Sequence, residues 1–205
     1  MLHGILKENL SSRPVPVSDE HILIPFVAPL SIISNQPSYA QDSINLKRRT
    51  GSQQVQRWEI TTNLHPTNNN GDTLIHSIIH GTHTSFLVTM PQIHALPGVE
   101  DLKDTTISVQ SDAYTNTITT VTKLVKGEFI NLGLSYKVYS VIAVNNLVAT
   151  LFPALQKGCN PTMPVYRGRQ VLAKVFYDID TQLGLHYVDG VLADPGSVKL
   201  IEDLS

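Results

Sequence analysis

The chain has 205 residues, enough for one generous domain or for one domain that carries a small inserted module. Only 16% of the residues are charged and the formal net charge is −2, so the clustered positive face that binds nucleic acid is missing. A single cysteine, Cys159, excludes an internal disulfide and any site with several thiolate ligands.

Neither a membrane segment nor a leader is predicted. No stretch approaches the roughly 20 apolar residues that a membrane helix needs. The N-terminal residues lack the basic and apolar regions of a secretion signal. We therefore expect a soluble protein that is made in the cytoplasm and does not insert into membranes.

Prolines punctuate the first thirty residues. Pro14, Pro16, Pro25 and Pro29 each fix φ and remove a backbone donor, so this stretch is predicted to be extended. An extended segment loses little entropy when it is ordered on a neighbour. We expect residues 1–30 to form an arm, with Pro14, Pro16 and Pro25 as candidates for contact with another chain.

Two short β runs follow, separated by a turn at residues 35–37, and then a strictly alternating segment. In that segment Arg57 and Glu59 fall on one face, and Trp58 and Ile60 fall on the other. The second set is apolar, so it is predicted to face the core. Arg57 is predicted to face outward and becomes a further candidate for an interface.

The segment 72–81 has the one pattern that is typical of a helix. Asp72 is a suitable N-cap, Gly81 is a suitable C-terminal stop, and leucine and isoleucine recur between them at helical spacing. A strand that contains Phe86 follows and is expected to end at Pro91.

From residue 104 onward the sequence is almost wholly β, with glycine, asparagine or aspartate at the joints. We predict a mainly β protein: a β-sandwich core over 31–120 that includes the helix, a small β-barrel insertion over 121–157, and strands over 158–205 that return to the core. The predicted structural anchors of this fold are Trp58, Ile60, Phe86, Phe129 and Tyr139.

Histidines give the sharpest local signal for chemistry. His76 and His80 are four residues apart on the predicted helix, a spacing that can hold zinc, but no second-shell carboxylate accompanies them. A metal-dependent hydrolase that uses them with Asp178 is therefore an alternative of low weight. The pair Asp178 and Asp180 does not complete a calcium loop, and no G-x-S-x-G motif is present. We expect no catalytic residue, no cofactor and no bound metal.

Several segments, taken in their order along the chain, resemble structural proteins of tailed-bacteriophage tail tips and baseplates, of the distal-tail or hub-ring type. The matching residues are Arg57-Trp58-Glu59, then Lys126-Gly127-Glu128-Phe129-Ile130 with Lys137-Val138-Tyr139, then Leu151, Pro153 and Leu155.

The resemblance implies a non-enzymatic virion protein. Such a chain would form a ring at the distal end of the tail and connect the tail tube to hub or fibre proteins. Its partners would be further copies of itself and those tail proteins, and it would be made in the host cytoplasm. Two alternatives stay open: a capsid decoration protein, and a carbohydrate- or receptor-binding module of the same particle.

Overall fold

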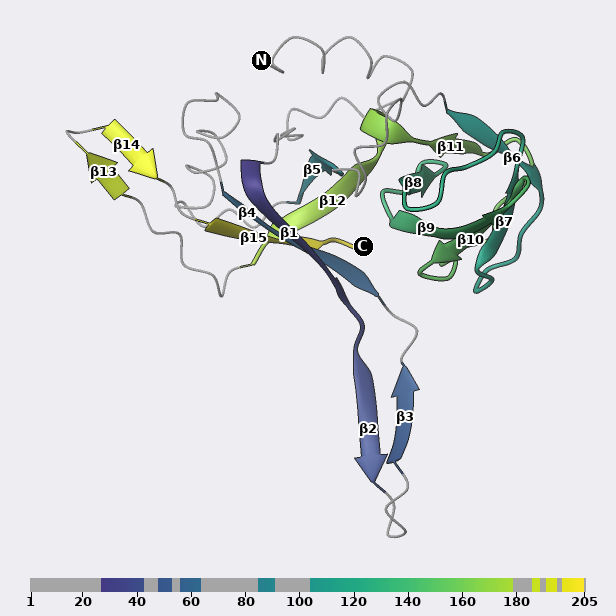
Figure 1. Ribbon diagram of the computed structural model, residues 1–205, viewed down its shortest axis with the longest axis horizontal. Coiled ribbons are helices and arrows are strands. Elements are labelled where there is room, and N and C mark those ends of the chain that lie inside the picture. The colour runs from purple at the N-terminus through teal and green to yellow at the C-terminus, as the bar shows by residue number, and fades with distance from the viewer. Residues whose placement is uncertain are drawn as a thin grey trace.

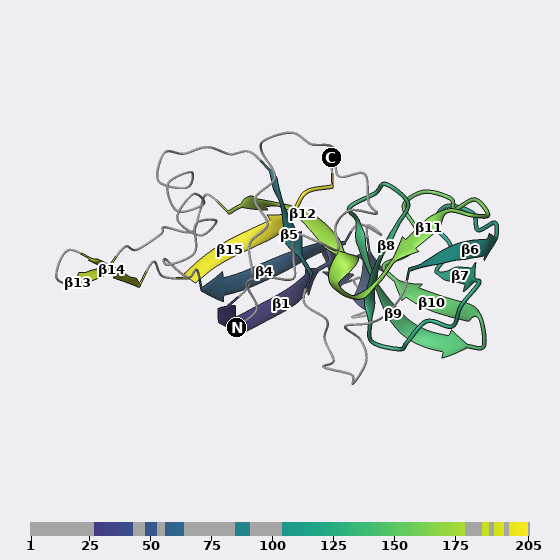
Figure 2. The same cartoon turned by 90° about the horizontal axis from the view of Figure 1, so that it is seen from above.

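A computed structural model describes residues 27–42, 48–52, 56–63, 85–90, 104–178, 186–188, 191–194 and 197–204. In these residues the protein is mainly β: an open five-stranded sheet and a closed barrel lie side by side, and two hairpins extend away from them (Figures 1 and 2). The helix expected over 72–81 lies outside the described residues, in which the helical structure is the 3-10 turn η3 (Gly168–Gln170).

The open sheet is antiparallel throughout and separates an apolar face from a polar one. Trp58 and Ile60 point into the apolar face, as the alternation of the sequence predicts, and pack there with Val88, Val175 and Leu200. In spatial order its strands are β1 (Val27–Asn35), β4 (Arg57–Asn63), β15 (Ser197–Glu202), β12 (Leu172–Tyr177) and β5 (Phe86–Thr89).

The polar face of this sheet carries ion pairs. The Glu59 carboxylate lies 3.4 Å from Arg57 and 3.1 Å from Lys199, and it accepts a hydrogen bond from the Asn35 amide. The side chain of Arg57 is 43% exposed, whereas that of Glu59 is only 10% exposed. Glu59 therefore faces outward, as predicted, but is covered by the cations around it.

The barrel is inserted between two neighbouring strands of the sheet. It follows β5 and precedes β12 in the sequence, and these two strands pair with each other. The closed ring includes residues on both sides of the expected stretch 121–157, because its first and last strands are β6 and β11. Around the ring the order is β10 (Val148–Phe152), β7 (Thr117–Thr120), β6 (Thr105–Val109), β11 (Pro164–Tyr166), β8 (Phe129–Leu132) and β9 (Val138–Asn145).

Aliphatic side chains fill the barrel, and none of its strands contains a charged residue. Ile107, Ile118, Ile130, Val141 and Leu151 are all buried in one cluster. A closed barrel leaves no free sheet edge, so its strands pair completely around the ring. The exposed residues on its strands include Ser108, Val109, Thr117, Ile142 and Val148.

Both hairpins consist of two short strands. The first, β2 (Ser38–Asp42) with β3 (Arg48–Ser52), continues β1 and β4 beyond the sheet and projects away from the body (Figure 1). The second, β13 (His186–Val188) with β14 (Val191–Asp194), lies at the far end of the sheet from the barrel (Figures 1 and 2).

Trp58 joins the sheet to the barrel. Its ring packs edge-on against Phe129 at 5.3 Å and Phe152 at 6.2 Å between centroids, and both of these residues belong to the barrel. The indole Nε1 donates a hydrogen bond of 2.9 Å to the carbonyl of Val138. Trp58 is 6% exposed, so it is a packing residue and not an open platform for a ligand.

We expect Trp58→Ala to lower the free energy of unfolding by about 3–5 kcal/mol, because it leaves a cavity where the sheet and the barrel meet. Chemical denaturation followed by circular dichroism measures this loss. Tyr114→Ala is a matched control, since Tyr114 is 76% exposed, and its effect should stay within about 0.5 kcal/mol. A Trp58→Ala protein as stable as this control would contradict the assignment.

Candidate functional site

A buried polar network lies at the junction between the sheet and the barrel. The Lys137 ammonium is 2.6 Å from the Glu202 carboxylate, and the two side chains are 2% and 1% exposed. Lys137 also donates to the backbone carbonyl of Gln56 at 2.9 Å and to its side-chain oxygen at 2.7 Å. The ammonium therefore has three acceptors, which is its full capacity.

Glu202 is satisfied in the same way. One of its oxygens accepts from the backbone N–H of Trp58 at 3.0 Å, and the other accepts from the backbone N–H of Val138 at 3.1 Å. Trp58 belongs to the sheet and Val138 to the barrel, so a single carboxylate is bonded to both parts. Breaking the pair on one side would leave a buried charge without its partner, which is strongly destabilising.

Burial is the largest cause of the pKa shifts of both Glu202 and Lys137. It raises the pKa of Glu202, and the neighbouring Lys137 and the two backbone donors oppose that rise. Burial also lowers the pKa of Lys137, and Glu202 opposes that fall. Each charge is thus maintained by the other, which makes the pair a structural unit and not a source of free protons.

Two further buried contacts hold the barrel around this network. Asn131 accepts from the backbone N–H of Leu172 at 2.7 Å and donates to the carbonyl of Lys137 at 3.0 Å, so it ties β8 to the first residue of β12. The Arg167 guanidinium binds Glu128 through two nitrogens, at 3.1 Å and 3.0 Å. A two-point pair of this kind fixes direction as well as distance.

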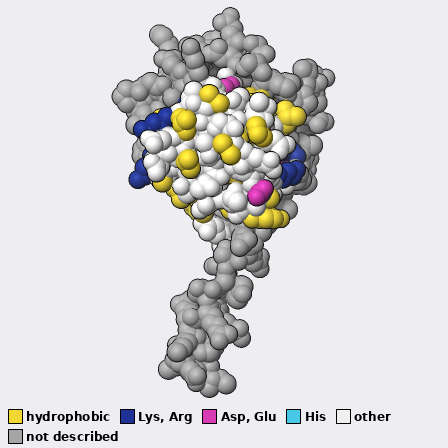
Figure 3. Space-filling model, turned by 90° about the vertical axis from the view of Figure 1, so that its right-hand side faces the viewer, with side chains coloured by type: hydrophobic (Ala, Val, Ile, Leu, Met, Phe, Trp, Pro, Cys, Tyr) yellow, Lys and Arg dark blue, Asp and Glu magenta, His cyan; other side chains and the backbone are white. Residues whose placement is uncertain are grey.

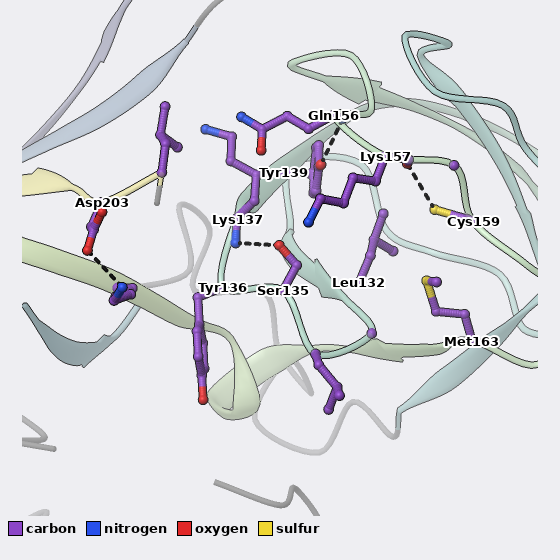
Figure 4. A pocket seen from close by; sticks show the side chains of 15 residues that line it. Leu132, Ser135, Tyr136, Lys137, Tyr139, Gln156, Lys157, Cys159, Met163 and Asp203 are labelled. Carbon is purple, nitrogen blue, oxygen red and sulfur yellow. Dashed lines mark hydrogen bonds and ion pairs between the residues drawn. The ribbon is translucent and has the colours of Figure 1, made fainter. Parts of the chain in front are cut away.

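An open groove of about 460 Å³ runs along the same junction (Figure 4). Its walls come from the turn between β8 and β9, from residues 156–159, and from Asp203 and Leu204, which follow β15. Tyr136, Gln156 and Asp203 lie on different sides of the groove (Figure 4), and Asp203 pairs with Lys174 at 2.9 Å.

The groove contains no activated nucleophile among the residues described. Burial raises the pKa of the Cys159 thiol, so the thiol stays protonated at neutral pH and is a poor nucleophile. Burial likewise raises the pKa of Tyr139, whose hydroxyl oxygen accepts a hydrogen bond from the backbone of Gln156 at 3.3 Å.

All five residues named as anchors are buried. Trp58, Ile60, Phe86 and Phe129 lie in one apolar cluster between the sheet and the barrel. Tyr139 lies in the separate cluster inside the barrel. The sequence places these residues far apart, and the fold brings four of them together.

Several other candidates fall outside the described residues. These are His76, His80, Pro14, Pro16 and Pro25, and also Asp180. Within the residues that are described, no three histidine, cysteine, aspartate or glutamate side chains gather closely enough to hold a metal ion. The same residues include no helix with the length and hydropathy needed to cross a bilayer. Asp178, proposed as a metal ligand in the hydrolase alternative, pairs with Lys199 at 3.2 Å.

Sequence reasoning missed the polar members of the junction. The sequence places Gln56 on the inward face of its strand with Trp58, and it places Lys137 in a motif without assigning it to the core. Asn131 and Glu202 carry no prediction. Lysine is almost always exposed in proteins, so nothing local indicates that Lys137 is buried, and its partner Glu202 is 65 residues away.

Comparison with known proteins gives no match to a family model and none to a curated protein. A function for this chain therefore has to be argued from its own residues.

We expect Lys137→Met to destabilise the protein in a pH-dependent manner. Without the ammonium, Glu202 keeps a buried charge, and its pKa in the folded state rises further above its unfolded value of about 4.3. A group whose pKa is raised by folding contributes its full stability at pH values below the unfolded pKa. That stability is lost as the pH rises through the folded pKa. The stability deficit should therefore be small near pH 4 and reach about 3–5 kcal/mol near pH 8.

Urea denaturation of both proteins over this pH range measures the deficit. The matched control is Lys137→Met combined with Glu202→Gln, which has no buried charge and should show a smaller deficit that does not vary with pH. A single variant whose deficit is the same at both ends of the range would show that Glu202 does not bear the buried charge.

Proposed function

We propose that this chain is a non-enzymatic structural protein of a phage virion, which forms a ring at the distal end of the tail and connects the tail tube to hub or fibre proteins. In this proposal the open sheet belongs to a β-sandwich body, and the inserted barrel and the N-terminal arm contact adjacent tail proteins.

One observation carries the proposal: Trp58, Phe129 and Val138, which come from separate segments of the resemblance to tail-tip proteins, meet at the junction. Trp58 is bonded to Val138, Glu128 holds Arg167, and Phe129 packs against the Trp58 ring. These residues come from separate segments of the resemblance, and each takes part in joining the sheet to the barrel or in closing the barrel. Side chains committed to rigid internal contacts support an architectural role.

The outer surface of the barrel supports contact with other proteins. Its strands hold no charge, and Val109 of β6 and Val148 of β10 flank Thr119 of β7 in a row across three neighbouring strands. Val109 is 55% exposed and Val148 is 42% exposed. Figure 3 shows hydrophobic side chains scattered over a largely uncharged surface, with lysine and arginine at its margins. Depletion of charge is typical of the centre of a protein interface.

A second candidate rests on the groove at the junction. Tyr136, Gln156 and Asp203 place an aromatic ring, an amide and a carboxylate on different walls of the groove, and a carbohydrate- or receptor-binding site uses groups of these kinds. This arrangement favours the receptor-binding alternative. No feature of the described residues specifically supports a capsid decoration protein.

Immunogold labelling tests the proposal. Antibodies against this chain, applied to phage particles that encode it and viewed by electron microscopy, should label the host-proximal end of the tail. Label on the capsid would contradict the proposal in favour of a decoration protein, and label on fibre tips would favour receptor binding. Absence of label from both intact and disrupted particles would reject a virion protein altogether.

A further inference from the structure

The loop between β6 and β7 exposes an aromatic side chain to solvent. Tyr114 is 76% exposed, more than any other large hydrophobic residue that the structure describes. Its backbone has a φ of 66°, in the left-handed region that a residue with a bulky side chain seldom adopts. Strained conformations of this kind persist where the surrounding structure enforces them, and they gather at sites of binding. We use the name tyrosine loop for residues 111–116.

Backbone hydrogen bonds fix the tyrosine loop against the segment that follows β10. The N–H of Tyr114 donates to the carbonyl of Leu155 at 2.7 Å, and Ser111 and Cys159 exchange bonds of 3.0 Å and 2.8 Å. Gly158 permits this close approach, because a Cβ there would lie 3.1 Å from the carbonyl oxygen of Ser111. The loop is therefore held in one conformation before a partner arrives, which lowers the entropy lost on binding.

The same segment also lines the groove at the junction, through residues 156–159. Leu132 and Met163 contribute apolar side chains to the groove, and Leu134, which also lines it, is 72% exposed. The volume of about 460 Å³ lies in the range of ligand pockets, roughly 300–1,000 Å³. The groove is therefore large enough to take an aromatic side chain.

The charges of the groove and of the tyrosine loop are complementary. Of the three lysines that line the groove, two pair with Glu202 and Asp203. The third, Lys157, is exposed, makes no ion pair within the described part of the chain, and reaches into the groove (Figure 4). In the tyrosine loop Asp112 is exposed two residues before Tyr114. A ring with a nearby carboxylate thus matches an apolar lining with a nearby ammonium.

We propose that the tyrosine loop of one copy of this chain docks in the groove of a second copy, with Tyr114 against the apolar lining and Asp112 paired with Lys157. Tyrosines that are buried in a pocket at an interface are among the residues that contribute most to association. The opposite charges beside the ring fix the orientation of the loop. This inference goes beyond the ring proposed above and does not depend on it.

The position of the loop beside the groove sets the symmetry of the contact. Both are attached to residues 155–159 of the same copy. A two-fold axis that brings one loop to the second groove therefore also brings the second loop to the first groove. The surface is then complementary to itself, as an isologous dimer requires. Two equal contacts form together, and a dimer that lacks one of them keeps the other.

A complementation experiment tests the contact with the full chain. The loop variant carries Tyr114→Ala, and the groove variant carries Leu134→Glu with Lys157→Glu. All three residues are exposed, so these changes should leave the fold of the single chain intact. Sedimentation velocity over a range of concentrations gives the dimer dissociation constant of the wild type, of each variant and of an equal mixture of the two. Ile33→Ala is a control, because Ile33 is 54% exposed but belongs to the open sheet.

We expect the wild type to dimerise and each variant alone to dimerise roughly a thousandfold more weakly, because a tyrosine at the centre of a contact contributes a factor of roughly thirty and both contacts are lost. The mixture should be only roughly thirtyfold weaker than the wild type, because the intact loop of the groove variant docks in the intact groove of the loop variant. This partial recovery excludes misfolding as the cause of the loss. Ile33→Ala should dimerise as the wild type does.

Three results would overturn the contact: a wild type that stays monomeric at every concentration, variants that dimerise as tightly as the wild type, and a mixture that associates no better than either variant alone. None of these results bears on where the protein lies in the particle. Absence of gold label from the tail tip would instead overturn the proposed function, whatever the dissociation constants show.

Discussion

The ion pair between Lys137 and Glu202 fixes how the two parts of this protein meet. Two full charges lie out of contact with water at 2.6 Å, and each is tolerated because the other is present and both groups are bonded to further partners. The amide nitrogen of Gln56 beside them is buried and has no hydrogen-bond partner among the described residues. Glu202 bonds to the backbone of the sheet at Trp58 and of the barrel at Val138. A shift of the barrel by even one residue would leave these groups unpaired, so the network selects one arrangement. Apolar packing of Trp58 against Phe129 then stabilises it.

This constraint suits the way the barrel is inserted. The chain leaves the sheet after β5 and returns in β12, which pairs with β5, so the sheet continues as though the barrel were absent. An insertion of this kind could swing on its two connections, but Asn131 ties the start of β12 to the interior of the junction. The body is therefore one rigid unit from which two hairpins extend. The ring proposed for this chain would need such a rigid body, because the angle between neighbours must be the same at every step.

Sequence alone predicted the local features and missed those that depend on distant partners. The alternation around Trp58 identified its inward face, since a strand has a period of two and one face of the sheet is buried. The strand positions from Thr105 onward also follow from local signals. The turn expected at residues 35–37 is wrong, because β2 continues β1 and pairs with β3 as β1 pairs with β4. The stretch of sequence that forms the barrel is longer than predicted. Its last strand, β11, could not be recognised, because it has only three residues and begins with a proline, which is typical of a loop. The partner of Lys137 is equally hidden: Glu202 lies at the end of the last predicted strand, and only the closed fold brings the two together.

Native-state hydrogen exchange measures most directly whether the junction makes the sheet and the barrel one cooperative unit. The amides of Trp58 and Val138, which donate to Glu202, should exchange only through global unfolding, with the same free energy and denaturant dependence as the amide of Ile130 inside the barrel. Exchange of Trp58 and Val138 by a low-energy opening that is independent of denaturant, while Ile130 stays protected, would contradict the account. It would mean that the barrel moves on the sheet and that the buried ion pair does not hold them together.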